Sequence, residues 1–152
     1  MHWFWRDLLD NGILWVTVLS WSIAQFIKII IGVIREKRFN FKWIFGTGGM
    51  PSSHAAGVST LATAIGLTAG FDSYLFALAA IFAFITMFDA QTSRRSIGVQ
   101  ARILNRIMDD LSHNKGVEEH KLRELIGHTP IEVLVGCLLG IGIALALGSR
   151  LL

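Results

Sequence analysis

Charged residues are scarce in this sequence. Only 16% of its 152 residues are Asp, Glu, Lys or Arg, whereas a soluble domain carries about a quarter. Hydrophobic residues make up 53% of the chain and lie in long runs, with a mean hydropathy of +0.54. This composition argues against a soluble globular protein and favours one embedded in a membrane.

Cysteine is almost absent, and so are linker-like stretches. The single cysteine, Cys137, excludes an internal disulfide, and its place in an apolar run is typical of a small packing residue. No Pro-rich or Ser-rich linker interrupts the chain, and its length suits one domain, residues 1–152. No small-residue cleavage site follows the first apolar run, so we do not expect Met1–Asn11 to begin a cleavable signal peptide.

Four apolar segments dominate the chain, each approaching the length that crosses a bilayer core of ~30 Å as a helix. They span residues 12–34, 51–70, 73–88 and 128–147. The third is expected to end in the polar stretch 89–95, and two amphipathic helices, 97–111 and 117–126, follow it. The sequence therefore predicts an all-α integral membrane bundle of about four transmembrane helices, with an amphipathic helical insert at 95–127.

Basic residues are concentrated in two places. Four Lys or Arg lie in 35–42 and seven in 94–123, whereas the turn at Asp72 has none. The positive-inside bias places both basic stretches in the cytoplasm and both termini outside a multi-pass cell-membrane protein. We interpret the basic insert as facing anionic lipids of the bilayer rather than a nucleic acid.

A glycine-rich turn, Thr47–His54, precedes the second apolar segment. Glycines let the backbone approach a ligand, and Pro51 suits the first turn of a helix. The N–H groups at such a helix start form an anion site, to which a histidine can add proton transfer. The alternative is a plain loop whose serines cap the helix.

Residues able to bind or cleave a phosphate gather at one end of the predicted bundle. Ionisable groups in membrane helices are costly and tend to mark function, and cations with imidazoles and a carboxylate suit phosphate chemistry. No His/Asp/Glu set has metal-ligand spacing, so no metal is expected. The candidate residues are Lys28, Arg35, Gly49, Ser52, Ser53, His54, Asp89, Arg94, Arg95, His128 and Glu132.

Two of these groups have alternative interpretations. Lys28 and Arg35 share one helix face two turns apart and could hold one anion, but Lys28 could instead extend to the membrane surface. Glu132, four residues after His128, could orient that imidazole for attack on phosphorus. It could equally close a capping box with Thr129, and the two roles are compatible. His128 itself could be a structural residue at a helix start.

Taken together, these motifs resemble the type 2 phosphatidic acid phosphatase (PAP2) family, and most closely its divergent branch. Gly-Gly-Met-Pro-Ser-Ser-His stands at 48–54, Asp-Ala…Arg-Arg at 89–95, Leu-Asn at 104–105 and Gly-His-Thr-Pro-x-Glu at 127–132. The resemblance covers about residues 12–148. The chain departs from the main family in three ways. Glu36 follows Arg35, and Glu132 stands in place of an aspartate. About thirty residues separate Arg94 or Arg95 from His128.

The resemblance implies a metal-independent lipid phosphatase that needs no cofactor. His128 would form a phosphohistidine, Glu132 would orient it, and His54 would act as acid and base. Lys28, Arg35, Ser52 and either Arg94 or Arg95 would bind the phosphoryl group. Phosphatidylglycerophosphate, phosphatidic acid and polyprenyl phosphates all fit as substrates. The alternatives are a non-catalytic binder or carrier of lipid phosphates and a structural membrane subunit.

Two G-x-x-x-G pairs, Gly66/Gly70 and Gly136/Gly140, lie within the apolar segments. This spacing lets helices approach closely in lipid. It makes a homo-oligomer possible without establishing one.

Overall fold

The structure is a computed structural model that describes residues 2–37, 49–112 and 128–151, without the side chains of 2, 93–97, 110–112 and 149–151. Within these residues all regular structure is α-helical, which confirms the predicted all-α class. The helices are α1 (His2–Leu9), α2 (Gly12–Glu36), α4 (Ser53–Ala69), α5 (Tyr74–Ser112) and α6 (Pro130–Leu151).

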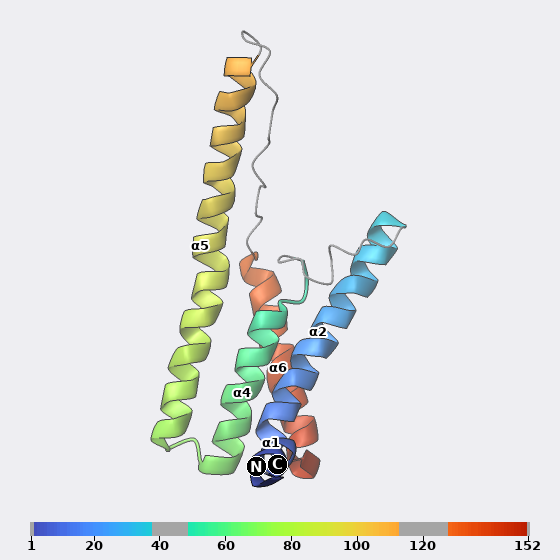
Figure 1. The fold of residues 1–152 in the computed structure, drawn as a ribbon, viewed down its shortest axis with the longest axis vertical. Helices are drawn as coiled ribbons and strands as arrows, with labels where there is room; N and C mark the ends of the chain where they lie inside the picture. The colour runs from blue at the N-terminus through green and yellow to red at the C-terminus, as the bar shows by residue number, and fades with distance from the viewer. Residues whose placement is uncertain (1, 38–48, 113–127, 152) are drawn as a thin grey trace.

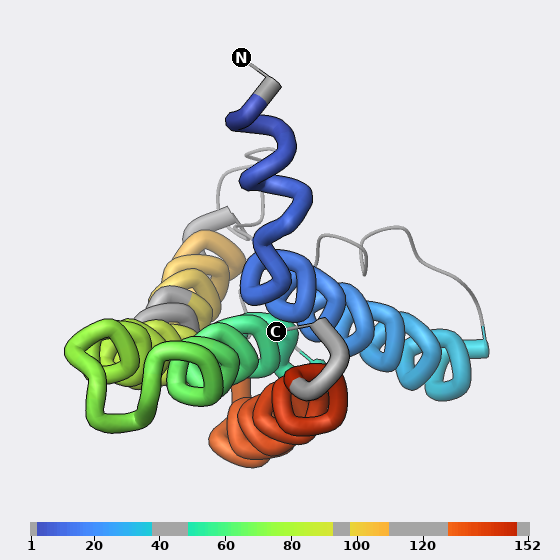
Figure 2. Tube along the Cα trace, turned by 90° about the horizontal axis from the view of Figure 1, so that it is seen from below, coloured from blue at the N-terminus to red at the C-terminus, as the bar shows by residue number. Residues whose placement is uncertain are grey.

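Helix α4 is the centre of the bundle. It packs against α2, α5 and α6, which surround it when the molecule is seen end-on (Figure 2). Figure 1 shows α2 and α5 running in one direction and α4 and α6 in the other. The first turns of α4 and α6 therefore lie at the same end of the bundle, opposite the start of α2 and the end of α6.

The central place of α4 follows from its small side chains, which let neighbouring backbones approach closely. Gly136 and Gly140 of α6 fit directly against it, because a Cβ at either would clash with the backbone of Ser52 or Ala56. A Cβ at Gly66 would meet the ring of Phe71. Both G-x-x-x-G pairs thus contribute packing within the chain. These glycines therefore do not support self-association, which stays a prediction.

Hydroxyl groups connect α4 to its neighbours. Thr60 Oγ1 lies 2.7 Å from Ser20 Oγ of α2 and 2.9 Å from the carbonyl of Gly140 in α6. Ser59 Oγ lies 3.1 Å from the carbonyl of Cys137. Such bonds between apolar helices contribute about 0.6 kcal/mol each on average, so the group fixes the register of three helices more than it drives their association.

Three segments of the described chain are long and apolar enough to cross a membrane: Gly12–Glu36, Tyr74–Thr92 and Pro130–Gly148. Large apolar side chains cover their outer surfaces, as expected of helices that face lipid. Helix α4 has 17 residues, about 25 Å of helix at 1.5 Å per residue, which is short for a ~30 Å core. The four-span prediction therefore holds in its coarser form, an all-helical membrane protein with three candidate spans.

The predicted end of the third helix at 89–95 is wrong. Helix α5 continues without a break for 39 residues, to Ser112. The polar and basic residues there mark a change of surroundings, but no proline stops the backbone hydrogen bonds. The first part of the predicted insert therefore belongs to α5, whereas the predicted helix 117–126 lies outside the described residues.

In the described part of residues 97–111, Gly98, Ala101 and Asn105 are buried, whereas Leu104 is 48% exposed. The buried row has the helical spacing of three and four residues.

Candidate active site

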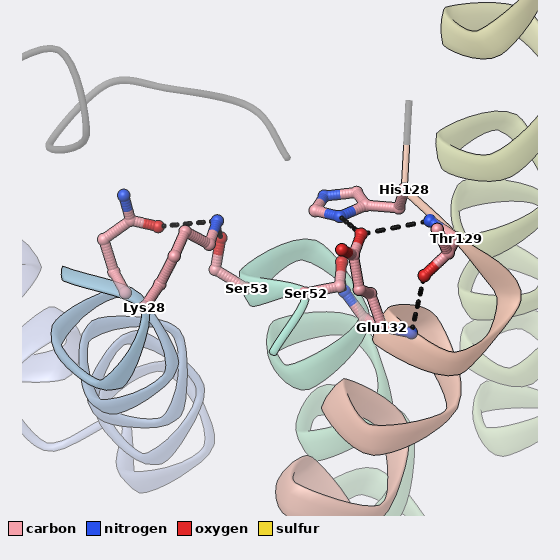
Figure 3. Close-up of polar contacts among 8 residues, drawn as sticks. Lys28, Ser52, Ser53, His128, Thr129 and Glu132 are labelled. Atoms are coloured by element: carbon pink, nitrogen blue, oxygen red, sulfur yellow. Dashed lines mark hydrogen bonds and ion pairs between the residues drawn. The ribbon is translucent and has the colours of Figure 1, made fainter. Parts of the chain in front are cut away.

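Helix α6 begins with a capping box. The backbone N–H of Thr129 donates to Glu132 Oε2 at 3.0 Å, and the N–H of Glu132 donates to Thr129 Oγ1 at 3.4 Å (Figure 3). This reciprocal pair satisfies two N–H groups that have no partner within the helix. The predicted capping box is therefore confirmed, and Pro130 occupies its usual first helical position.

The same carboxylate oxygen also contacts His128. Glu132 Oε2 lies 3.2 Å from Nδ1 of His128, whose side chain is almost fully buried. The backbone N–H of His128 donates to the carbonyl of Ala90 in α5 at 3.2 Å. A carboxylate at Nδ1 favours the tautomer that carries its proton there and leaves a lone pair on Nε2. One oxygen atom thus caps the helix and contacts the imidazole.

Helix α4 begins with Ser52 as its N-cap. Ser52 Oγ accepts a hydrogen bond from the N–H of Ala55 at 3.3 Å, and its own N–H donates to the carbonyl of Glu132 at 3.0 Å. The second bond ties the start of α4 to the first turn of α6. Two helix N-termini, each with a positive dipole end, therefore lie side by side.

The two histidines of the motifs, His54 and His128, come together at these helix starts. Their ring centroids are 6.2 Å apart and their planes are inclined by 62°. The predicted convergence of the two imidazoles is therefore present in the fold.

Lys28 reaches the same region from α2. Its Nζ lies 3.2 Å from Gln25 Oε1 and 3.4 Å from Ser53 Oγ, and the residue is only 7% exposed (Figure 3). The side chain points into the bundle and does not extend to the membrane surface. Gly49, at a φ of +86°, lies over the Lys28 stem, where an added Cβ would stand 3.5 Å from Cγ.

Gln25 is a buried polar residue of α2 that was not among the predicted candidates. Its signal in the sequence was its place three residues before Lys28 in an apolar segment, where a buried amide needs a partner. It supplies that partner through the hydrogen bond to Lys28. Gln25 therefore positions the ammonium group that sequence reasoning had assigned to phosphate.

Comparison with known proteins identifies the family of this chain. The sequence profile of the Divergent PAP2 family matches residues 9–143. The chain belongs to the Divergent PAP2 family. It is 42% identical to the uncharacterized membrane protein YuiD of Bacillus subtilis (strain 168), over 93% of this chain and 96% of that protein. No solved structure matches the chain.

The remaining candidates of this Divergent PAP2 protein lie on α2 and α5. Arg35 is exposed on the last turn of α2, and Asp89 is exposed on α5 beside Ala90. Arg94 and Arg95 belong to α5, but their side chains lie outside the described part of the structure. Among the described side chains, those gathered at the two helix starts are Lys28, Gly49, Ser52, Ser53, His54, His128 and Glu132.

The donor set of this Divergent PAP2 site suits an anion. An ammonium group, hydroxyls and two imidazoles predominate, with Glu132 already engaged by Thr129 and His128. Among the described residues, no group of three or more His, Cys, Asp or Glu side chains is arranged to hold a metal ion.

Proposed function

We propose that this protein is a membrane phosphatase that hydrolyses the phosphate of a lipid head group through a phosphohistidine. The observation that carries the proposal is the pairing of His54 and His128, with ring centroids 6.2 Å apart and Glu132 at Nδ1 of His128. One nucleophile, one acid–base group and one orienting carboxylate are the minimum that such a double displacement needs.

In the first step Nε2 of His128 attacks phosphorus and the bond from phosphorus to the lipid oxygen breaks. His54, protonated, gives its proton to that leaving oxygen. Glu132 keeps the proton on Nδ1 of His128 and stabilises the positive charge that the ring gains. In the second step the oxygen of a water molecule attacks phosphorus, and His54, now neutral, takes a proton from that water. The bond from phosphorus to Nε2 of His128 breaks, which releases inorganic phosphate and restores His128.

Binding of the phosphoryl oxygens is assigned to the groups at the two helix starts. Backbone N–H groups of the first turn of α4 and the Lys28 ammonium, 3.4 Å from Ser53 Oγ, supply positive charge there. Arg35, Asp89 and either Arg94 or Arg95 are proposed as further contacts of the substrate.

The depth of the site supports a lipid substrate. Ala90, which accepts the hydrogen bond of His128, lies two residues before the end of the Tyr74–Thr92 span. The third span starts at Pro130, two residues after His128. The histidines therefore lie at the level where apolar helices leave the hydrocarbon core and head groups begin.

The basic residues of 35–42 and 94–123 support a cytoplasmic location for this end, by the positive-inside rule. Phosphatidylglycerophosphate, phosphatidic acid and polyprenyl phosphates all present a terminal phosphate at this depth. The first is attractive as a substrate because it is made on the cytoplasmic face.

The test is phosphate release by the purified protein from each of these lipids in detergent, alongside His128→Ala and His54→Ala. We expect release by the wild type, near-complete loss in both variants, and an acid-labile phosphoprotein that His128→Ala abolishes. Equal release by all three proteins would refute the mechanism. Lipid binding without turnover and without dependence on His128 would indicate a carrier instead.

A further inference from the structure

An apolar groove leads away from His54 between α2, α4 and α5. It encloses about 340 Å³, and its walls are apolar. On α4 it follows one helix face from His54 through Gly57 to Leu61, a distance of about 10 Å at 1.5 Å per residue. Its volume lies in the range of about 300–1,000 Å³ that is usual for ligand sites.

The groove opens toward the membrane. Val18 and Trp21 of α2, each 43% exposed, and Phe82 of α5, 53% exposed, form its outer wall. Both helices contain segments able to cross a bilayer. Because these exposed side chains lie on helices able to cross a bilayer, the groove is accessible to hydrocarbon, and its polar lining residues are Thr17 and His54.

We infer that this groove binds one hydrocarbon chain of the lipid whose phosphate is bound at His54 and His128. The inference rests on the function proposed above. His54 lines the groove and also belongs to the histidine pair, so a phosphate at that pair places its attached chain at the groove entrance. The groove runs for about 10 Å toward the membrane centre, which suits the first part of a chain in a half-core of ~15 Å.

Gly57 creates the space at the centre of the groove. A Cβ at this position would lie 3.8 Å from Cβ and Cδ1 of Trp21, which is ordinary contact. Alanine therefore fits here, whereas a longer side chain would extend into the groove. Substrate recognition then has two parts: the helix starts bind the phosphate, and the groove selects lipids over water-soluble phosphates.

The first experiment narrows the groove with Val18→Phe and compares it with Leu19→Phe. Leu19 is the matched control, because it is similarly exposed, at 41%, but does not line the groove. The readout is the ratio of kcat/KM for long-chain phosphatidic acid to that for p-nitrophenyl phosphate. We expect Val18→Phe to lower this ratio about tenfold, as displacement of two methylenes from the groove would do.

The ratio should stay at its wild-type value in Leu19→Phe. Gly57→Leu provides a second narrowing variant from the opposite wall. An unchanged ratio in both narrowing variants would overturn the inference, even if phosphatase activity is present.

The second experiment does not depend on turnover. Wild-type protein is photolabelled with phosphatidic acid that carries a diazirine in one acyl chain, and the labelled peptides are mapped. We expect labelling at 17–21 and 57–61 that unlabelled phosphatidic acid removes and diacylglycerol of the same chains does not. Labelling spread over all lipid-facing surfaces, indifferent to both competitors, would show only bulk lipid and overturn the inference.

The two experiments separate the two proposals. If no phosphate is released from any lipid but the labelling is specific, the groove inference stands and catalysis fails. If phosphate is released, but the kcat/KM ratio is unchanged in both narrowing variants and the labelling is spread over all lipid-facing surfaces, catalysis stands and the groove inference fails.

Discussion

Helices α4 and α5 lie side by side but face different surroundings. Helix α4 buries nine residues, all Ala, Gly, Ser or Thr, against its three neighbours. Helix α5 exposes large side chains along its first half, among them Leu78 at 70% and Phe84 at 63%. One sequence is adapted to protein contacts and the other to lipid, although both are apolar by composition. Substitutions that change size should therefore matter on α4 and its partners and matter little on the outside of α5.

The difference also explains where chemistry is placed. The start of α4 joins that of α6 through the bond from Ser52 N–H to the carbonyl of Glu132, so groups there have fixed positions. A lipid-facing surface offers no such neighbours. Preorganised groups are what stabilise charge as it develops in a reaction, so the small-residue core supports the proposed site.

The largest expected effect comes from His128→Ala at the α4–α6 junction. Loss of the nucleophile should lower kcat by at least ~10³-fold, because no other group in the mechanism can form the phosphoenzyme. Phosphate release from phosphatidic acid measures this, with Leu78→Ala on the outside of α5 as the control. Comparable activity in the two variants would mean that the helix starts are not catalytic.

Glu132→Gln tests orientation of the imidazole against capping of the helix. The amide can still accept from the N–H of Thr129, but it carries no charge to stabilise the imidazolium, so kcat should fall by about 10²–10⁴-fold. Thr129→Ala is its counterpart, since it removes the cap at a cost of about 0.5–2 kcal/mol and leaves the His128–Glu132 contact. Measurements of kcat and melting temperature on both variants separate the two roles. Equal losses of kcat in both would mean that Glu132 has no orienting role beyond capping the helix.

Gly140→Ala tests the packing of α6 on α4. An added methyl would press on Ser59 and the carbonyl of Ala56, and overpacking of this kind costs about 1–3 kcal/mol. Gly142→Ala is the matched control, because no atom lies within 4 Å of a Cβ placed there. We expect Gly140→Ala to lower the melting temperature in detergent and Gly142→Ala to leave it unchanged. A shift of equal size in both would show that α6 does not pack on α4 through Gly140.

The smallest effect is expected on the lipid side of α5. Leu78→Ala should change the free energy of unfolding by less than about 0.5 kcal/mol, as is usual for surface substitutions. Ala83→Leu, one turn further on, should destabilise more, because Ala83 is 4% exposed and packs with Ala62 and Ala79. Denaturation in detergent gives the free energy of unfolding of both variants. A larger loss in Leu78→Ala than in Ala83→Leu would mean that Leu78 packs against protein and does not face lipid.

Much of the fold could be predicted from apolar runs alone. Helix α2 was predicted at 12–34. It ends at Glu36, and the next residue, Lys37, takes a left-handed conformation with φ of +52°. The error at 89–95 arose because polarity was read as a helix end. Polarity reports where a helix leaves the apolar phase, whereas an end requires a cap or a residue that breaks the backbone hydrogen bonds.

The site was partly predictable for a related reason. Ser52 as a cap and Glu132 in a capping box are local, and local spacing reveals them. The support that His128 receives from the carbonyl of Ala90 was not predictable, since any residue presents such a carbonyl. Gly136 and Gly140 suggested contacts between chains, but their spacing does not say which helix fills the notch.

By itself the sequence determined which segments are helical, where α4 and α6 begin, and which side chains could handle a phosphate, because hydrophobic period and capping act over a few residues. The tertiary structure alone decided that His54 and His128 meet, that Lys28 turns inward to Ser53, and that an apolar groove follows α4 from His54. These outcomes depend on close approach between helices far apart in the chain. Only the packing of small residues on α4 brings that approach about.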